Sequence, residues 1–308
     1  MEHRAVGASG LRVSRTGLGT LTWGRDTDSD EAAAQLVGFV DAGGTLVDIS
    51  PGYAGGAAQS VLAELIGDLV PRAAVVLSAA SGAQPGGLVD CSRRALLAQL
   101  DATLAELGTD HLDLWQVCAW DPLTPVAEVV DTLEHAVRSG RVRYAGVRDY
   151  TGWQLATAVG AACGPGLVVV QTEYSLLERG IEAELAPAAA HHGVGVLAAV
   201  PLARGVLTGK YRQGTPADSR GASTHLAASL KPHRNKSASR VVEAVVTAAE
   251  GLGTSPLAVA LAWVRDRPGV AGAIVGARTA AQLTGVLAED DVMLPTAIRA
   301  ALDDVSSR

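Results

Sequence analysis

The chain has little of several features that mark common protein classes. Its three cysteines, Cys91, Cys118 and Cys163, are widely spaced and form neither a metal-binding pattern nor an even disulfide framework. No run approaches the ~18–20 apolar residues of a membrane span, and the N-terminus lacks the segments of a signal peptide. The net charge is −7 and no basic cluster is present, which argues against nucleic acid as a partner. We therefore expect a cytoplasmic protein that binds neither membranes nor nucleic acids.

Large aromatic and lysine side chains are also scarce. Phenylalanine occurs once and lysine is nearly absent, so Leu, Val and Ala must fill the core. Apolar residues nevertheless make up 48% of the 308 residues, and this length allows a substantial core. The length suits either one large α/β barrel or two ordinary domains.

Segments with strand and helix patterns alternate along the chain. The predicted strands are Gly17–Leu21, Thr45–Ser50, Ala74–Ala80, His111–Trp120, Val142–Val147, Leu167–Thr172, Val194–Pro201 and Val270–Ala277. The predicted helices are Ser29–Ala42, Ala57–Leu69, Val89–Leu107, Val126–Ser139, Trp153–Ala162, Ile181–His191 and Ser237–Leu252. This order indicates right-handed βαβ units, and eight such strands favour a closed (β/α)8 barrel, the TIM barrel. A doubly wound open sheet is the alternative, but no Gly-x-Gly-x-x-Gly turn follows the first strand.

Three segments lie outside the eight repeating units. Residues 3–16 alternate around a Gly-Ala-Ser-Gly turn and predict a β-hairpin that plugs the bottom of the barrel. Residues 203–236 form a long polar connection, and loops of this length in compact domains are usually functional or mobile. The tail, Leu294–Arg308, predicts an extra C-terminal helix. We find no linker composition and expect a single domain over residues 1–308.

The ends of the predicted strands gather the residues that could carry chemistry, because catalytic groups of a barrel lie where strands end and loops begin. Taken singly, each of these residues has a structural explanation, but their joint placement favours a site. No metal constellation can be assembled from them. This neighbourhood consists of Trp23, Asp48, Tyr53, Ala80, Cys118, Trp120, Arg148, Asp149, Gln171, Tyr174 and residues 200–210.

Asp48 and Tyr53 are the most informative members of this neighbourhood. They place a carboxylate and a phenol five residues apart, directly after a buried strand. A phenol is a poor proton donor at neutral pH unless a nearby cation stabilises its phenolate. The next two strands end at Ala80 and Cys118, so neither supplies a basic side chain. We therefore expect an acid–base site that lacks its cation.

Six passages, spread over essentially the whole chain, share a common resemblance. They are 42–53, which includes Asp48 and Tyr53; 107–114; 140–147; 171–175; Pro201–Tyr211; and Val275–Leu283. In this order they resemble the aldo-keto reductase superfamily. The resemblance implies a TIM barrel that reduces aldehydes and ketones with NADPH. It also implies an Asp-Tyr-Lys-His tetrad in which Tyr donates the proton, Lys lowers the phenol pKa and His orients the carbonyl.

Only half of that tetrad matches this sequence. Asp48 and Tyr53 occupy the first two positions, while the Lys position falls on Ala80 and the His position on Cys118. Losing a positioned acid–base partner typically costs about 10²–10⁴-fold in rate. Without the ammonium, the Asp48 carboxylate would raise the pKa of Tyr53 and oppose the reductase mechanism. We therefore expect impaired family-type reduction.

The NADP(H) site implied by the resemblance is retained in part. Arg148-Asp149 replace a Ser-Asn pair that holds the nicotinamide, and Arg148 either fills that space or recognises an anionic substrate, in a pocket walled by Trp23 and Trp120. Arg278 suits an adenosine 2′-phosphate, because a guanidinium forks onto phosphate oxygens. The retained positions are Gln171, Tyr174 as the nicotinamide-stacking ring, Leu202, Gly205, Leu207, Lys210, Gly276, Arg278 and Gln282.

Three functions remain open at this point. The first is a repurposed enzyme for non-redox proton transfer (dehydration, isomerisation or cyclisation), with Asp48 or Asp149 as base and Tyr53 as donor. The second is an NADPH-dependent reductase that uses Tyr53, with Cys118 in place of His. The third is a non-catalytic ligand-binding or partner protein. We favour the first; the sequence predicts a small-molecule substrate and leaves its identity and the oligomeric state open.

Overall fold

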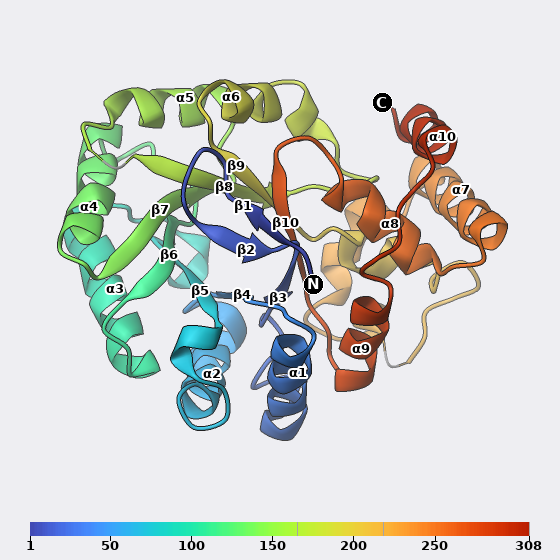
Figure 1. The fold of residues 1–308 in the computed structure, drawn as a ribbon, viewed down its shortest axis with the longest axis horizontal. Coiled ribbons are helices and arrows are strands. Elements are labelled where there is room, and N and C mark those ends of the chain that lie inside the picture. Colours follow the sequence, from blue (N-terminus) through green and yellow to red (C-terminus); the bar gives the residue numbers. More distant parts are fainter. Residues whose placement is uncertain (165, 218, 308) are drawn as a thin grey trace.

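The computed structural model describes residues 1–164, 166–217 and 219–307, and its eight parallel strands close into a barrel (Figure 1). The strands are β3 (Thr16–Gly19), β4 (Leu46–Ile49), β5 (Val76–Ser81), β6 (Leu112–Val117), β7 (Val142–Arg148), β8 (Leu167–Glu173), β9 (Gly195–Ala199) and β10 (Val270–Val275). Neighbours in the chain are neighbours in the sheet, and β10 pairs with β3 to close it. The predicted TIM barrel is confirmed.

Helices surround the barrel, as Figure 1 shows. They are α1 (Ser29–Asp41), α2 (Ala57–Leu65), α3 (Arg93–Leu107), α4 (Val126–Arg138), α5 (Gly152–Ala161), α6 (Leu185–His191), α7 (Lys236–Leu252), α8 (Pro256–Arg265), α9 (Ala280–Ala288) and α10 (Thr296–Ser306). The predicted helices and the helical tail are present, but α8 and α9 were not predicted. Helix α8 is buried on every side from Ala258 to Arg265, so it lacks the amphipathic period by which a sequence reveals a surface helix.

The N-terminal hairpin covers one end of the barrel. Strands β1 (His3–Ala5) and β2 (Arg12–Ser14) pair antiparallel, and the hairpin lies across the barrel in Figure 1. Its buried Val6, Leu11 and Val13 pack against barrel residues that include Leu46 and Leu114. The predicted plug is therefore confirmed, and the other end of the barrel is left for the site.

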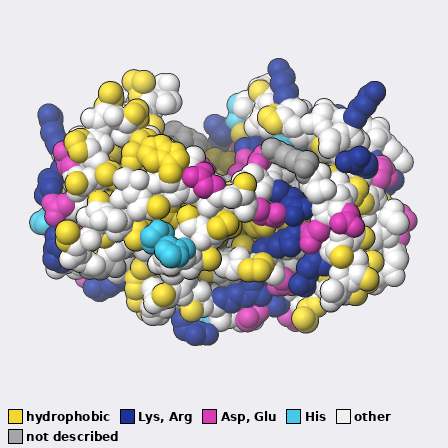
Figure 2. Space-filling model, turned by 90° about the horizontal axis from the view of Figure 1, so that it is seen from above, with side chains coloured by type: hydrophobic (Ala, Val, Ile, Leu, Met, Phe, Trp, Pro, Cys, Tyr) yellow, Lys and Arg dark blue, Asp and Glu magenta, His cyan; other side chains and the backbone are white. Residues whose placement is uncertain are grey.

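The connection after β9 folds into short 3₁₀ helices instead of a featureless loop. They are η5 (Ala203–Thr208), η6 (Arg220–Ala222) and η7 (Ala227–His233). Arg204 of η5 joins this segment to the barrel, because its Nη1 donates to Glu173 Oε1 at 2.6 Å and lies 2.8 Å from His233 Nε2. Figure 2 shows one edge of the molecule notched between two raised lobes.

No single helix in the described part of the chain is long and apolar enough to cross a membrane. Helices α7 and α8 together meet the length and composition, but the chain bends by 103° between them.

Candidate active site

Asp48 and Tyr53 meet at the end of β4 that lies away from the hairpin. Asp48 is 1% exposed, and the chain turns after β4 into the 3₁₀ helix η1 (Tyr53–Gly56), which directs the phenol back over the strand. The Tyr53 hydroxyl donates to Asp48 Oδ2 at 3.2 Å. The carboxylate and the phenol therefore form a direct pair.

A cation completes this pair, so the expectation that the site lacks one is wrong. Arg148, at the end of β7, reaches Asp48 and donates from Nη2 to Oδ1 at 2.5 Å. Its Nη1 donates to the Tyr53 hydroxyl at 3.5 Å. Arg148 is only 7% exposed and does not line the cavity as a substrate or nicotinamide contact, because both ends of its guanidinium are engaged by this pair. Arg148 lies at the end of β7, whereas the expectation concerned only the two strands that follow β4.

Further polar side chains, on β5, β6 and β8, surround Asp48. Ser78 Oγ donates to Asp48 Oδ1 at 3.0 Å, and Gln171 Nε2 donates to Oδ2 at 3.4 Å. Gln116 Nε2 lies 2.9 Å from both Ser78 Oγ and Gln171 Oε1. With Arg148 and Tyr53, Asp48 thus accepts four hydrogen bonds. These contacts hold both carboxylate oxygens of Asp48 in place.

The environment keeps the phenol protonated. Burial raises the pKa of Tyr53 well above its ordinary value, and the Asp48 carboxylate adds to this effect, while Arg148 opposes it. Burial likewise raises the pKa of Cys118, again opposed by Arg148. Burial of the Asp149 carboxyl raises its pKa, although the residue as a whole is exposed. At neutral pH the site therefore offers a neutral phenol next to a fixed ion pair.

Ala80 and Cys118 each lie two residues further along their strands than Ser78 and Gln116, the members of this network on β5 and β6. Ala80 follows Ser78 by two residues in β5, so its methyl group shares the face of the sheet that carries Ser78. It is 3% exposed. Cys118 directly follows β6, two residues after Gln116, and is half-buried. Neither residue is basic, so Arg148 is the cation that the structure provides to Tyr53.

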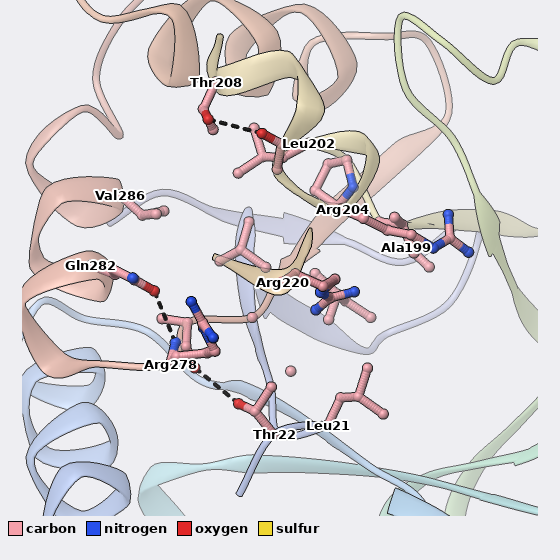
Figure 3. Close-up of a pocket in the computed structure, with 18 of the residues that line it drawn as sticks. Leu21, Thr22, Ala199, Leu202, Arg204, Thr208, Arg220, Arg278, Gln282 and Val286 are labelled. Carbon is pink, nitrogen blue, oxygen red and sulfur yellow. Dashed lines mark hydrogen bonds between the residues drawn. The ribbon is translucent and has the colours of Figure 1, made fainter. Parts of the chain in front are cut away.

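A cavity of about 500 Å³ opens beside Asp48 and Tyr53. Its walls come mainly from the loops after β9 and β10 (Figure 3). Most residues that the resemblance assigned to the cofactor line this one cavity: Gln171, Leu202, Gly205, Lys210, Gly276, Arg278 and Gln282. Arg204 and Thr208, which belong to the predicted 200–210 segment, line it as well. Arg220 also lines it and was not predicted; the high Gly, Ser and Arg content of residues 203–236 was the signal that could have indicated it.

Three cations face this cavity without an ion-pair partner among residues 1–164, 166–217 and 219–307. They are Lys210, Arg220 and Arg278. Figure 3 shows Arg220 and Arg278 reaching the cavity from different loops. Burial lowers the pKa of Arg220, and the neighbouring charges of Arg204 and Arg278 act in the same direction. Clustered cations repel one another unless an anion lies between them, so this part of the cavity suits phosphate groups.

The backbone at the mouth of the cavity is strained. Val200, Ala203 and Arg204 have φ values of 54°, 47° and 58°, in the left-handed region that favours glycine. A β-branched residue such as Val200 is rare there. Ala54 and Asp149, in the loops after β4 and β7, are also in this region. Strain of this kind is retained where the surrounding structure needs a particular loop shape, as at binding sites.

Three predicted site residues lie elsewhere. Trp23 is fully buried and donates from Nε1 to Gln35 Oε1 at 3.1 Å, so it forms no pocket wall. Tyr174 donates its hydroxyl to Glu182 Oε1 at 2.7 Å and is 4% exposed, outside the residues lining the cavity. Leu207 is fully buried in the core. Their positions near strand ends are right, but the side chains point into packed regions.

Trp120 belongs to an aromatic cluster at the rim. Its ring lies 5.4 Å from that of Tyr150 and 5.1 Å from that of Trp153, both in edge-to-face geometry. Trp153 is 54% exposed. These loops follow β6 and β7, whereas the cavity opens mainly between the loops after β9 and β10.

The chain is a closed eight-stranded barrel with Asp48 and Tyr53 in the wall of one cavity, and comparison with known proteins identifies its family. The aldo/keto reductase family model matches residues 15–306, and the chain belongs to this family. Members of the family are oxidoreductases that generally depend on NADP(H).

Named relatives cover nearly the whole chain. The protein named "Uncharacterized oxidoreductase YrpG" of Bacillus subtilis strain 168 is 33% identical, over 99% of this chain and 96% of its own length. A "Probable voltage-gated potassium channel subunit beta" of Oryza sativa subsp. japonica is 32% identical, over 95% and 92%. An "L-glyceraldehyde 3-phosphate reductase" of Escherichia coli O157:H7 is 30% identical, over 92% and 86%.

Proposed function

We propose that the protein is an NADPH-dependent carbonyl reductase in which Tyr53 donates the proton. One observation carries this proposal: a single cavity has Tyr53 and Asp48 in its wall and also holds three cations that suit phosphates and have no ion-pair partner among the described residues. A proton donor and an anion site within one cavity are what a reductase with a phosphate-bearing cofactor requires. The family membership supports the same function.

The residues that line the cavity fit NADPH. Lys210, Arg220 and Arg278 would hold its phosphates, with Arg278 as the partner of the adenosine 2′-phosphate, because a guanidinium binds phosphate oxygens through two parallel hydrogen bonds. Gln171 lies near Asp48 and would contact the nicotinamide end. When bound, NADPH supplies a hydride to the substrate carbonyl.

The chain's own residues supply the proton and its control. Tyr53 holds the proton on a phenol that lines the cavity. Asp48 Oδ2 accepts a hydrogen bond from the Tyr53 hydroxyl and so fixes the position of the phenol. Arg148 places a positive charge beside the oxygen that becomes a phenolate when the proton leaves. General acid catalysis by a positioned group of this kind contributes about 10²–10⁴-fold.

The same contacts weaken the non-redox hypothesis in the version that uses Asp48 as the base. Asp48 was a candidate base for proton transfer, but its oxygens accept hydrogen bonds from Arg148, Ser78, Tyr53 and Gln171. Both oxygens are therefore engaged by protein groups. The expectation of impaired reduction rested on a missing cation, and Arg148 removes that reason.

NADPH titration followed by tryptophan fluorescence tests the proposal. We expect saturable binding by the wild type, and consumption of NADPH when aldehydes, ketones or quinones are added. Arg278→Met should raise the Kd for NADPH about 10–100-fold, since a charge-assisted contact is worth about 1.5–3 kcal/mol, and should change NADH binding less. Arg94→Met, at an exposed position of α3, is the matched control and should leave both constants unchanged.

Two results would contradict this function. Wild-type protein that binds no NADPH at millimolar concentration excludes the reductase. Turnover of a carbonyl substrate that proceeds equally well without NADPH favours the non-redox enzyme instead.

A further inference from the structure

We infer that Arg148 is the cation that supports proton donation by Tyr53, in place of the lysine that the family resemblance puts at Ala80. The inference rests on the proposed function and deepens it. Arg148 acts through Tyr53, so it is a positioning residue with a charge role. The positive charge of the site has thus moved from β5 to β7, while Asp48 and Tyr53 keep their places.

The contacts of Arg148 meet both requirements of such a cation. Its Nη2 lies 2.5 Å from Asp48 Oδ1, and its Nη1 lies 3.5 Å from the Tyr53 hydroxyl. Two nitrogens of one planar guanidinium therefore connect the carboxylate and the phenol, which a single ammonium would do with one atom. Arg148 is in this way both the ion-pair partner of Asp48 and the charge beside the phenol.

The burial of the pair explains why a cation is needed at this place. Asp48 is 1% exposed and Arg148 is 7% exposed. A buried carboxylate without a partner is strongly destabilising. Ala80 contributes a methyl group on the interior face of β5 and offers neither charge nor hydrogen bond. Within the described residues, Arg148 is the one basic side chain bonded to Asp48 or Tyr53.

Other charged and titratable groups around Arg148 do not replace it. Asp48 and Tyr53 face it from the end of β4 and the loop that follows, Cys118 lies beyond β6, and Asp149 is its neighbour in the chain. All four lose a proton to become negative, so none can supply positive charge. The Arg148 guanidinium stays protonated at any working pH.

An exchange of the cation between the two strands tests the inference. We expect Arg148→Ser to lower kcat/KM by about 100-fold or more, the usual effect of losing an acid–base partner, with little change in the Kd for NADPH. Adding Ala80→Lys should return a positive charge to Asp48 and Tyr53 from β5. The double variant Ala80→Lys/Arg148→Ser should therefore recover at least about tenfold of the lost kcat/KM.

The pH profile separates a charge role from a structural one. In the wild type the cation does not titrate, so the alkaline limb of kcat/KM follows Tyr53. In Ala80→Lys/Arg148→Ser the cation is a lysine that can deprotonate, and the alkaline limb should move to lower pH. An arginine that only supports the fold would leave this limb in place.

A second variant keeps the test decisive if Arg148→Ser does not fold. Asp48→Asn/Arg148→Met removes both charges together, so it leaves no buried ion unpaired. We expect it to fold, to bind NADPH and to lose about 100-fold or more of kcat/KM. A folded variant of this kind with wild-type activity would overturn the inference.

Three further results have distinct meanings. Activity of Arg148→Ser within about threefold of wild type overturns the role of Arg148, since a lost acid–base partner costs far more. Normal NADPH binding by both variants without any recovery in Ala80→Lys/Arg148→Ser also overturns it. A wild-type protein that neither binds NADPH nor reduces a carbonyl removes the proposed function itself, and the two failures are thereby distinguished.

Discussion

The barrel interior contains two layers of side chains, two residues apart along each strand, that differ in polarity. The layer next to the hairpin is apolar, and the layer next to the cavity is polar, although both are buried. On β4, β6 and β8 the change occurs within two residues: Leu46 to Asp48, Leu114 to Gln116, and Val169 to Gln171. Side chains two apart on a strand share a face, so each strand contributes to both layers.

The difference shows how one barrel separates stability from chemistry. The apolar layer excludes water and needs only a close fit to Val6, Leu11 and Val13 of the hairpin. The polar layer is buried as well, so its groups must satisfy one another. Most of them do so through the network around Asp48, while Gln116 Oε1 and Arg148 Nε have no hydrogen-bond partner among the described residues. We therefore expect substitutions in the polar layer to act mainly on catalysis and those in the apolar layer to act mainly on stability.

Tyr53→Phe should give the largest effect on catalysis. It removes the proton donor and one hydrogen bond to Asp48, and should lower kcat/KM about 10²–10⁴-fold. Its free energy of unfolding should change by only about 1 kcal/mol, the usual value of one hydrogen bond. Tyr144→Phe, which removes a phenol near the hairpin end, is the control and should change neither quantity. Full activity of Tyr53→Phe would remove Tyr53 from the mechanism.

Leu114→Ala should give the largest effect on stability. It opens a cavity in the apolar layer, and truncating a buried leucine typically costs about 2–5 kcal/mol. Activity of the folded fraction should be preserved, because Leu114 does not contact the cavity. Chemical denaturation and steady-state kinetics at the same temperature measure both quantities. Leu123→Ala, at a side chain that is 89% exposed, serves as the control. If kcat of the folded protein falls together with the free energy of unfolding, the apolar layer also contributes to catalysis, and the expectation is wrong.

The smallest expected effect is on stability and concerns Glu173, which holds the segment after β9 to the barrel. Burial alone would raise the pKa of Glu173, but His233 and Arg204 outweigh it and lower the pKa to about 2. The ionised carboxylate therefore stabilises the fold above its ordinary pKa of 4.5, and this contribution is lost as the pH falls from 4.5 towards 2. Glu173→Gln should be less stable than wild type at pH 6, with a smaller gap near pH 3.

Denaturant unfolding at the two pH values measures this gap. Glu250→Gln, at an exposed carboxyl of α7, is the matched control and should show no such gap. If the difference between Glu173→Gln and wild type is the same at both pH values, the ionised Glu173 does not hold this connection to the barrel.

The fold could be predicted because its signals are local. Each barrel strand is a short apolar run between helical segments, and this order permits few topologies. The exceptions are instructive. Helix α8 carries no surface pattern, since it is buried on all sides, and periodicity reveals only helices with one exposed face.

The candidate site could be predicted less completely. Sequence position indicates the end of the barrel at which a residue lies, as it did for Asp48 and Tyr53. It does not indicate where the side chain points. Trp23 and Tyr174 follow strands as expected, but their polar atoms bond to Gln35 and Glu182, away from the cavity. These partners come from separate elements that only packing brings together.

The sequence by itself determined the barrel, the placement of Asp48 and Tyr53 at the end of one strand, and most of the positions around the proposed cofactor cavity. Only the tertiary structure decided where the cation of the site comes from. Arg148 is 100 positions from Asp48 in the chain, and no local pattern connects them. Closure of the barrel brings the ends of β4 and β7 to one interior, where the buried carboxylate and the long guanidinium side chain satisfy each other.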